Sequence, residues 1–310
     1  MALPTTSHPL PRTPLASQRV RELVLVSITM LWGGTFLAVQ TALQWSDPFV
    51  LVGLRFGLAA LMTMLIRGRA LRGVTRQELI AGSAIGVALF FGYTLQTIGL
   101  ESIPSSKSAF LTALYVPMVP LLQWVWLKRS PRAAAWLGIV MAFAGAVLLA
   151  DPTNLSWAFG LGDAVTILGA FAIAMEIVLM SRLSPGCDPG RLAVIQTVVV
   201  ALLCAPAAWL RNESLPSATP GLIACVLGLA ALTAVIQYAM NWAQQTISAT
   251  RATLIYSLEP VWAGVVGRLA GERLGPLGLL GGALIVLSIV VGEIRWPRWR
   301  RRVAPASRAA

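Results

Sequence analysis

Ten apolar runs follow one another through this chain, and their length decides the environment in which it can fold. Each run holds about 18–25 residues, and a helix rising ~1.5 Å per residue needs about 20 to cross a ~30 Å hydrocarbon core. The runs are residues 22–43, 48–66, 79–99, 107–127, 133–150, 158–182, 190–210, 220–243, 251–270 and 276–294. With 57% hydrophobic and 12% charged residues, the chain has more apolar surface than a soluble domain can bury. The sequence therefore predicts an all-α integral membrane protein with ten transmembrane helices.

The basic residues indicate which side of the membrane each connection faces. If the N-terminus is cytoplasmic, 19 of the 24 Lys and Arg residues lie on cytoplasmic segments, four on external segments and one, Arg55, within a run. This distribution follows the positive-inside rule and predicts that both termini are cytoplasmic. Residues 1–20, rich in Pro, Ser and Thr, are predicted to be a disordered tail, and the Arg-rich residues 295–310 a basic tail that touches anionic lipid. The net charge of +12 thus indicates a lipid bilayer, and no nucleic-acid partner is expected.

Residues that support catalysis or metal binding are scarce. The single histidine is His8, in the predicted tail, and the three cysteines are scattered over apolar runs and a loop, which gives no disulfide framework. No zinc motif, cysteine cluster or Ser–His pair can form within the membrane, so no enzymatic activity and no metal or cofactor is expected. A membrane-embedded enzyme is the alternative from a different functional class, and these absences disfavour it.

One sequence pattern occurs twice. Ser106-Lys107-Ser108-Ala109 precedes Pro117, and Ala249-Thr250-Arg251-Ala252 precedes Pro260, with eight residues from alanine to proline in both copies. Five apolar runs separate the copies, so the second crosses the bilayer in the opposite sense. Inverted repeats with an odd number of spans are typical of alternating-access transporters. The predicted repeats are residues 21–150 and 157–294.

The repeats can be aligned beyond these two segments. Pro48 precedes Arg55 by seven residues, as Pro189 precedes Gln196. Pro48 and Pro189 are 141 positions apart. Applied to earlier positions, this offset aligns Trp32-Gly33 with Ile173-Ala174, and Thr35 with Glu176. The alignment therefore extends through the first run of each repeat.

Several of these segments resemble the drug/metabolite transporter superfamily, and specifically its EamA-type exporters of ten helices. The matching elements are Trp32-Gly33-Gly34-Thr35-Phe36, Leu54-Arg55-Phe56, Ala109-Phe110-Leu111 to Pro117, Leu258-Glu259-Pro260 and Gly271-Glu272-Arg273-Leu274. The resemblance covers about residues 22–294 and lies in the order and spacing of motifs that are individually weak. One departure is Ile173-Ala174, where the family usually has a Trp-Ala pair.

The resemblance implies a particular arrangement of the ten helices. Six runs surround a central cavity, namely 22–43, 79–99, 107–127, 158–182, 220–243 and 251–270. The runs 48–66, 133–150, 190–210 and 276–294 are implied to be peripheral. The almost wholly apolar runs 133–150 and 276–294 independently suit lipid-facing or packing helices.

Three ionisable residues lie within the predicted spans. Glu259 lies roughly 14 Å from the cytoplasmic end of its run, near the middle of the membrane, where a charged residue usually faces a cavity or a partner. It is interpreted either as a structural hydrogen-bonding partner or as a counter-ion or protonatable coupling site for substrate. For Glu176, cavity lining and snorkelling toward the interface are both open. Arg55 is expected to snorkel outward or to pair with Asp47 or Glu101.

Polar and aromatic residues complete the predicted substrate cavity. Tyr93 and Gln96, and likewise Tyr238 and Asn241, are three apart and share a helix face. Pro117 and Pro260 are expected to kink their helices and to free the carbonyls of Ala113 and Tyr256. The full predicted set is Trp32, Thr35, Tyr93, Gln96, Thr112, Tyr115, Pro117, Glu176, Gln237, Tyr238, Asn241, Tyr256, Glu259 and Pro260.

These features together predict a monomeric secondary transporter of the bacterial inner membrane that exports small organic metabolites by alternating access. Amino acids are the first substrate class expected, and drug-like hydrophobic cations are the alternative. An antiporter of sugar phosphates or nucleotide sugars is less favoured, because such substrates need several inward-facing basic residues. Protons are an open candidate for the coupling ion.

Overall fold

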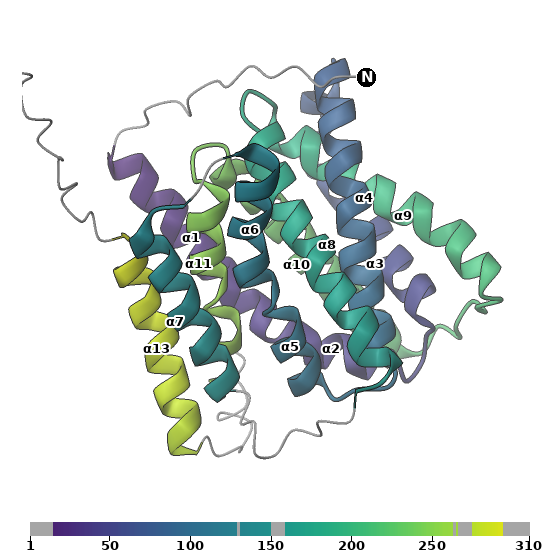
Figure 1. Ribbon diagram of the computed structural model, residues 1–310. Helices are drawn as coiled ribbons and strands as arrows, with labels where there is room; N and C mark the ends of the chain where they lie inside the picture. The colour runs from purple at the N-terminus through teal and green to yellow at the C-terminus, as the bar shows by residue number, and fades with distance from the viewer. Residues whose placement is uncertain (1–14, 129–130, 150–158, 263–264, 266–274, 294–310) are drawn as a thin grey trace, which may run out of the picture.

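The computed structural model describes residues 15–128, 131–149, 159–262, 265 and 275–293, and over these ranges the chain forms helices joined by short loops (Figure 1). The basic tail, residues 1–14 of the N-terminal tail, and the Gly271-Glu272-Arg273-Leu274 motif lie outside the described residues. The first helix already begins at Leu15, so the last residues of the predicted disordered tail are helical.

The helices match the ten predicted spans. They are α1 (Leu15–Gly33), α2 (Thr35–Ala42), α3 (Pro48–Arg67), α4 (Arg76–Gly99), α5 (Ser105–Thr112), α6 (Tyr115–Leu127), α7 (Ala133–Leu149), α8 (Leu161–Leu183), α9 (Pro189–Leu210), α10 (Pro220–Gln244), α11 (Ala249–Tyr256) and α13 (Pro276–Glu293), with the 3-10 turn η1 (Gly68–Leu71) after α3. Within the described ranges, seven segments are long and apolar enough to span a membrane, and α7 and α13 are shorter apolar helices. This confirms the all-α, ten-helix architecture, in which α1 and α8, the first helices of the two repeats, run in opposite directions (Figure 1).

Three of these spans are interrupted within the described part of the chain. The fourth span divides into α5 and α6 at Ala113 and Leu114, and the ninth turns at Ser257 and Leu258 before the helix resumes at Glu259. Both breaks lie just before a predicted kinking proline. The backbone N–H of Val116 donates to the Ala113 carbonyl at 3.0 Å, so the expectation that this carbonyl is free is wrong. A tight turn satisfies the group that the proline leaves without its helical donor.

The first span is also interrupted, and the sequence did not indicate it. α1 ends at Gly33 and α2 begins at Thr35, whose hydroxyl donates to the Trp32 carbonyl at 2.9 Å. The corresponding helix of the second repeat, α8, is continuous. The two repeats therefore share their topology but differ in this helix.

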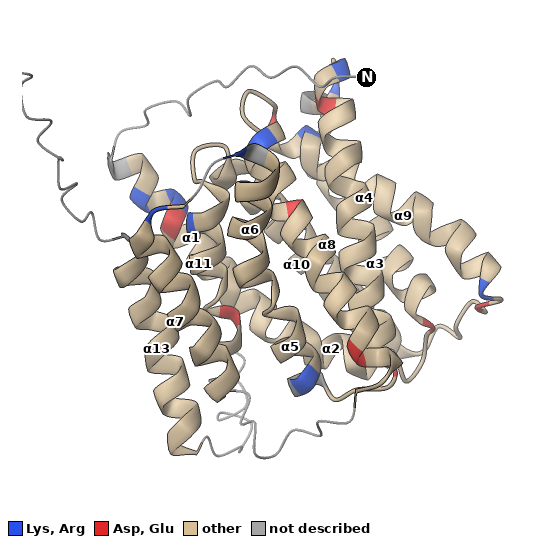
Figure 2. Ribbon diagram, in the orientation of Figure 1, with Lys and Arg blue, Asp and Glu red and all other residues tan. Residues whose placement is uncertain are grey.

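The four spans implied to be peripheral pack against one another in pairs. α7 lies beside α13, and α3 lies beside α9, at opposite edges of the bundle (Figure 1). Charged residues gather toward the two ends of the helices, and the central band is largely without them (Figure 2). This distribution matches a hydrocarbon layer across the middle of the bundle.

Close approach between α4 and α9 depends on a glycine. A Cβ placed on Gly86 of α4 would lie 2.9 Å from the backbone oxygen of Gln196 on α9. That atom belongs to the backbone of a packed helix and cannot rotate away. Small residues at such crossings let two membrane helices approach closely, and a larger one must separate them.

We expect Gly86→Ala to destabilise the protein by about 1–3 kcal/mol, the usual cost of overpacking a close-packed interface. The control is Gly228→Ala on α10, where an added Cβ meets nothing within 4 Å. Alanine there is expected to be neutral or to stabilise the helix by about 0.5–1 kcal/mol. Thermal unfolding of the detergent-solubilised variants measures both. Equal melting temperatures for the two variants would contradict the close approach at Gly86.

Arg55 does not snorkel outward, and the predicted pairing with Asp47 or Glu101 is wrong. Its side chain is 3% exposed, its Nε donates to the Thr233 hydroxyl of α10 at 2.6 Å, and its guanidinium carbon lies 5.0 Å from the centre of the Tyr93 ring. The Thr233 hydroxyl of α10 and the Tyr93 ring hold the guanidinium inside the bundle. Its Nη2 atom is buried without a partner.

The residue aligned with Arg55 in the other repeat makes the corresponding contact. Gln196 of α9 donates from Nε2 to the Oε1 atom of Gln237 at 2.7 Å, and Gln237 lies one turn after Thr233 on α10. The side chains at the aligned positions of α3 and α9 thus contact adjacent turns of α10. This polar contact fixes α10 between the two peripheral helices.

Thr233→Val is expected to cost about 1–3 kcal/mol, because it leaves the buried Nε of Arg55 without an acceptor. Thr197→Val is the matched control: Thr197 is equally buried, but its hydroxyl bonds only carbonyls of its own helix, at Ala193 and Val194. Its loss leaves no donor unpaired, so a change near zero is expected. Thermal denaturation in detergent compares the two, and an equal loss in both would show that Arg55 does not need Thr233.

Candidate functional site

A small cavity lies at the centre of the bundle, where the interrupted helices meet. It is lined by Trp32, Thr35, Phe36, Tyr93, Gln96, Thr112, Tyr115, Ile173, Glu176, Ile177, Met240, Tyr256 and Glu259. These residues come from the six spans implied to surround a cavity, and the four spans implied to be peripheral contribute none of them. For the central cavity, the lining residues follow the predicted division into lining and peripheral helices.

The wall of the cavity is strongly aromatic. The Trp32 and Tyr256 rings meet edge to face with their centres 5.1 Å apart, and Tyr93 meets Phe56 in the same way at 5.0 Å. In such pairs the positive ring edge approaches the negative face of its partner, which holds both rings in place. Tyr115 adds a further phenol from α6. The cavity thus presents aromatic faces and hydroxyl groups together.

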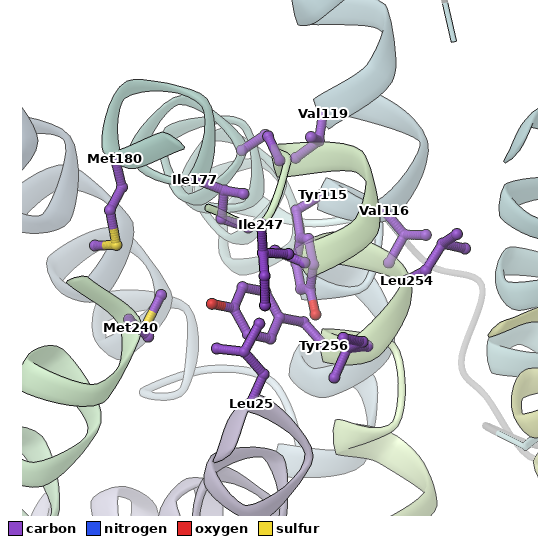
Figure 3. Packing of buried hydrophobic residues seen from close by; sticks show 14 of the residues in the cluster. Leu25, Tyr115, Val116, Val119, Ile177, Met180, Met240, Ile247, Leu254 and Tyr256 are labelled. Atoms are coloured by element: carbon purple, nitrogen blue, oxygen red, sulfur yellow. The ribbon is translucent and has the colours of Figure 1, made fainter. Parts of the chain in front are cut away.

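The end of the cavity toward the start of α11 is closed by apolar packing. Figure 3 shows the Tyr256 ring among Leu25, Ile247 and Tyr115, with Met180 and Met240 close to its hydroxyl side. Tyr256 is fully buried, and its hydroxyl accepts a hydrogen bond from Gln244 Nε2 at 2.8 Å. This cluster separates the cavity from the cytoplasmic ends of the helices.

Two carboxylates face the same cavity. Glu176 of α8 is 2% exposed, with one oxygen buried without a hydrogen-bond partner, and Glu259 follows the break after α11. Among the described residues, neither carboxylate forms an ion pair with an Arg or Lys side chain. For Glu176, the structure favours the interpretation as a cavity residue over snorkelling. A pair of acids without a basic partner in an apolar setting is costly unless something else compensates it.

Nine of the fourteen predicted site residues line this cavity. Gln96 also connects two of its walls, since its Nε2 donates to the Thr112 hydroxyl at 3.1 Å and joins α4 to α5. Pro260 lines a smaller adjoining cavity together with Glu259, on the side of α5 and α7. The adjoining cavity continues the central one past the break in the ninth span.

The remaining four predicted residues lie elsewhere. Tyr238 is 37% exposed on the outside of α10, where the Arg67 guanidinium lies 5.6 Å from its ring centre. Asn241 is buried but donates to the Gln237 carbonyl of its own helix at 2.8 Å, so the expectation that Tyr238 and Asn241 face one space is wrong. Gln237 lies behind the wall, beside Glu176, and Pro117 lines neither cavity. The three-residue spacing on α10 therefore did not predict which of these side chains points into the cavity.

Four lining residues are absent from the predicted set, and all are apolar: Phe36, Ile173, Ile177 and Met240. Phe36 follows Trp32 by four positions, and Ile173 aligns with Trp32 in the other repeat, so the sequence held a signal for both. Ile177 and Met240 resemble any core residue, and nothing in the sequence separates them from packing positions.

Comparison with known proteins agrees with this architecture. An uncharacterized transporter of Archaeoglobus fulgidus is 28% identical over 275 residues, which cover 88% of this chain and 86% of the relative. The uncharacterized inner membrane transporter YedA of Escherichia coli is 26% identical over 278 residues, covering 86% and 88%. A solved crystal structure, 18% identical, shares the fold with a TM-score of 0.74 over 90% of this chain and 96% of that chain.

The chain also matches the description of one transporter family twice, once in each repeat. The matches cover residues 21–150 and 160–292, which together include every residue named as lining the central cavity. The protein is a multi-pass membrane transporter that belongs to the EamA-like transporter family.

Proposed function

We propose that this protein exports small organic metabolites that carry an ammonium group, with amino acids as the first class, across the bacterial inner membrane by alternating access. The observation that carries the proposal is the cavity itself, where two carboxylates that pair with no basic side chain in the described part of the chain face a wall of aromatic rings. The Escherichia coli relative, named as an inner membrane transporter, supports the location.

An ammonium group suits this cavity on two physical grounds. It neutralises carboxylates that are costly to bury alone, and it is attracted to the faces of Trp and Tyr rings by about 0.5–2 kcal/mol. Trp32, Tyr93, Tyr115 and Tyr256 supply these rings. The positive end of a substrate therefore finds both kinds of partner in one place.

Arg55 favours amino acids over simple cations. Its guanidinium carbon lies 5.0 Å from the centre of the Tyr93 ring, which lines the cavity, and its Nη2 atom is buried without a hydrogen-bond partner. The region around Tyr93 thus carries a positive charge as well as two negative ones, which complements a zwitterion. A sugar phosphate is disfavoured, because no Arg or Lys is among the described residues that line the cavity.

Substrate entry requires movement. The cavity has a volume of ≈40 Å³, room for about three water molecules and too little for an amino acid. The two repeats therefore have to separate at one end before substrate binds. Rocking of inverted repeats about a central site supplies that movement.

Counterflow tests the proposal directly. Purified protein in liposomes loaded with unlabelled amino acids is expected to accumulate labelled amino acid from outside, and liposomes without protein are not. Hydrophobic cations such as tetraphenylphosphonium are tested in the same assay. Counterflow of the cations without counterflow of any amino acid would establish the alternative substrate class and overturn the first.

Glu259→Gln and Glu176→Gln are each expected to lower counterflow by about tenfold or more, equivalent to about 1.4 kcal/mol, because each removes a charge that the ammonium group needs. The control is Asp47→Asn, which neutralises an exposed acid at the start of the peripheral helix α3, outside the cavity lining. Its counterflow is expected to stay within about twofold of the parent. Unchanged flux in both cavity variants would refute a role for the acids.

Proton coupling is tested with the same proteins. If Glu259 exchanges a proton for substrate, flux through the parent rises when a pH gradient is imposed, and flux through Glu259→Gln does not respond to it. A Gln variant that keeps the response of the parent excludes Glu259 as the proton site. Net flux measured with and without a gradient, at fixed internal pH, separates these outcomes.

A further inference from the structure

Two ion pairs connect the ends of the cavity-lining helices, one at each face of the bundle. At the external end, Lys107 Nζ lies 2.7 Å from Asp163 Oδ1 and joins the first turn of α5 to the first turn of α8. At the cytoplasmic end, Arg251 Nη2 lies 2.7 Å from Glu22 Oε1 and joins the first turn of α11 to α1. We call them the external ion pair and the cytoplasmic ion pair.

The two ion pairs are related by the inverted repeat. Glu22 and Asp163 are 141 residues apart, the same offset that sets Trp32 against Ile173. Their basic partners lie on the aligned helices one position out of register, since Lys107 precedes Ala109 by two residues and Arg251 precedes the aligned Ala252 by one. The same device thus occurs once at each side of the membrane.

Both pairs lie at the same separation from the cavity. Lys107 precedes the lining residue Thr112 by five positions, as Arg251 precedes Tyr256, which is about 7.5 Å along a helix. Glu22 precedes Trp32 by ten positions, as Asp163 precedes Ile173, about 15 Å along a helix. The ion pairs therefore bracket the cavity symmetrically.

Each ion pair also bridges the two repeats. α5 belongs to the first repeat and α8 to the second, whereas α11 belongs to the second and α1 to the first. Any rocking of one repeat against the other must separate the helices at one end and bring them together at the other. An ion pair across the separating end has to break.

We propose that these two ion pairs are alternating locks: the external pair breaks when the cavity opens outward, and the cytoplasmic pair breaks when it opens inward. This goes beyond the proposed function, because it applies whatever the substrate is. Both pairs are formed in this structure, which shows neither end released. The free energies of the two open states then depend in part on four charged side chains that do not line the cavity.

The surroundings of the pairs support this role. The external pair borders a recess of ≈470 Å³ that Glu101 and Arg211 also line, so water and other charged groups are at hand when it opens. At the cytoplasmic end, the Arg21 guanidinium lies 4.5 Å from the centre of the Trp242 ring of α10 and reinforces that closure. Asp163 also accepts from the Gly160 backbone N–H at 2.8 Å, so the basic partner Lys107 is the better residue to change at the external end.

The two pairs differ in burial, and this predicts an asymmetry. The side chains of the external pair are 13% and 3% exposed, and those of the cytoplasmic pair 31% and 20%. Exposed ion pairs contribute about 0.2–1 kcal/mol, whereas removing one partner of a buried pair costs more. Loss of the external pair is therefore expected to shift the equilibrium further than loss of the cytoplasmic pair.

Cysteine accessibility tests the locks without any substrate. In a background with Cys187, Cys204 and Cys225 replaced by alanine, Thr112→Cys places a single reporter thiol on the cavity wall. A membrane-impermeant maleimide is applied to intact cells to probe the external side, and to inside-out vesicles to probe the cytoplasmic side. The extent of labelling then reports which end is open.

Lys107→Gln is expected to raise external labelling by at least about fivefold, and Glu22→Gln to raise cytoplasmic labelling by about two- to fivefold, the population shift equivalent to about 0.5–1 kcal/mol. Labelling from the opposite side should fall or stay level in each case. The control is Arg76→Gln, which removes an exposed positive charge from the first residue of α4, at the cytoplasmic end and outside the cavity lining. It should alter labelling from neither side.

The charge exchange Glu22→Arg with Arg251→Glu distinguishes a lock from general loosening, because it is expected to restore the labelling of the parent. Unchanged labelling in Lys107→Gln and Glu22→Gln would overturn the proposal, and so would equal increases from both sides in each variant. Because the readout needs no transport, its failure is distinct from failure of the amino-acid assay.

Discussion

The hydrocarbon core supplies no hydrogen bonds, and this constraint governs where the chain is allowed to depart from a helix. A break in a spanning helix is tolerated only where a turn satisfies the freed groups or where they face a polar space. At Ala113 a turn satisfies the freed carbonyl, and residues on either side of the breaks at Ala113 and Ser257 line a cavity. The cavity therefore exists where the helices break, and the breaks place Thr112, Tyr115, Tyr256 and Glu259 around it.

Much of this could be predicted from the sequence, because the bilayer reduces folding to a few discrete choices. Ten apolar runs determine ten spans, and the asymmetry of basic residues determines their direction. The kinks at Pro117 and Pro260 could be predicted because proline lacks a backbone N–H donor. The break at Gly33–Gly34 could not be predicted, because small residues are equally common where unbroken helices pack closely. From sequence alone, a glycine pair does not distinguish a helix break from a close helix contact.

Rotation of a helix about its axis was harder to predict. Tyr238 and Asn241 share a face by spacing, yet Arg67 draws the Tyr238 ring to the surface and Asn241 turns to its own backbone. Arg55 was misplaced for the same reason: its position along the membrane normal was clear, but its direction depended on an acceptor, Thr233, 178 residues away. Such long-range partners carry no local signal.

The repeats provide a symmetric frame, and the residues at aligned positions make its cavity asymmetric. Trp32 aligns with Ile173, Thr35 with Glu176 and Val116 with Glu259, so both acids come from the second repeat and most of the lining rings from the first. In the proposed rocking mechanism, the two negative charges move together because both belong to the second repeat. A cationic group bound to them, as proposed, would travel with that repeat while the aromatic wall of the first moves away. The symmetric frame would then set the motion, and the asymmetric lining would decide which half retains the substrate.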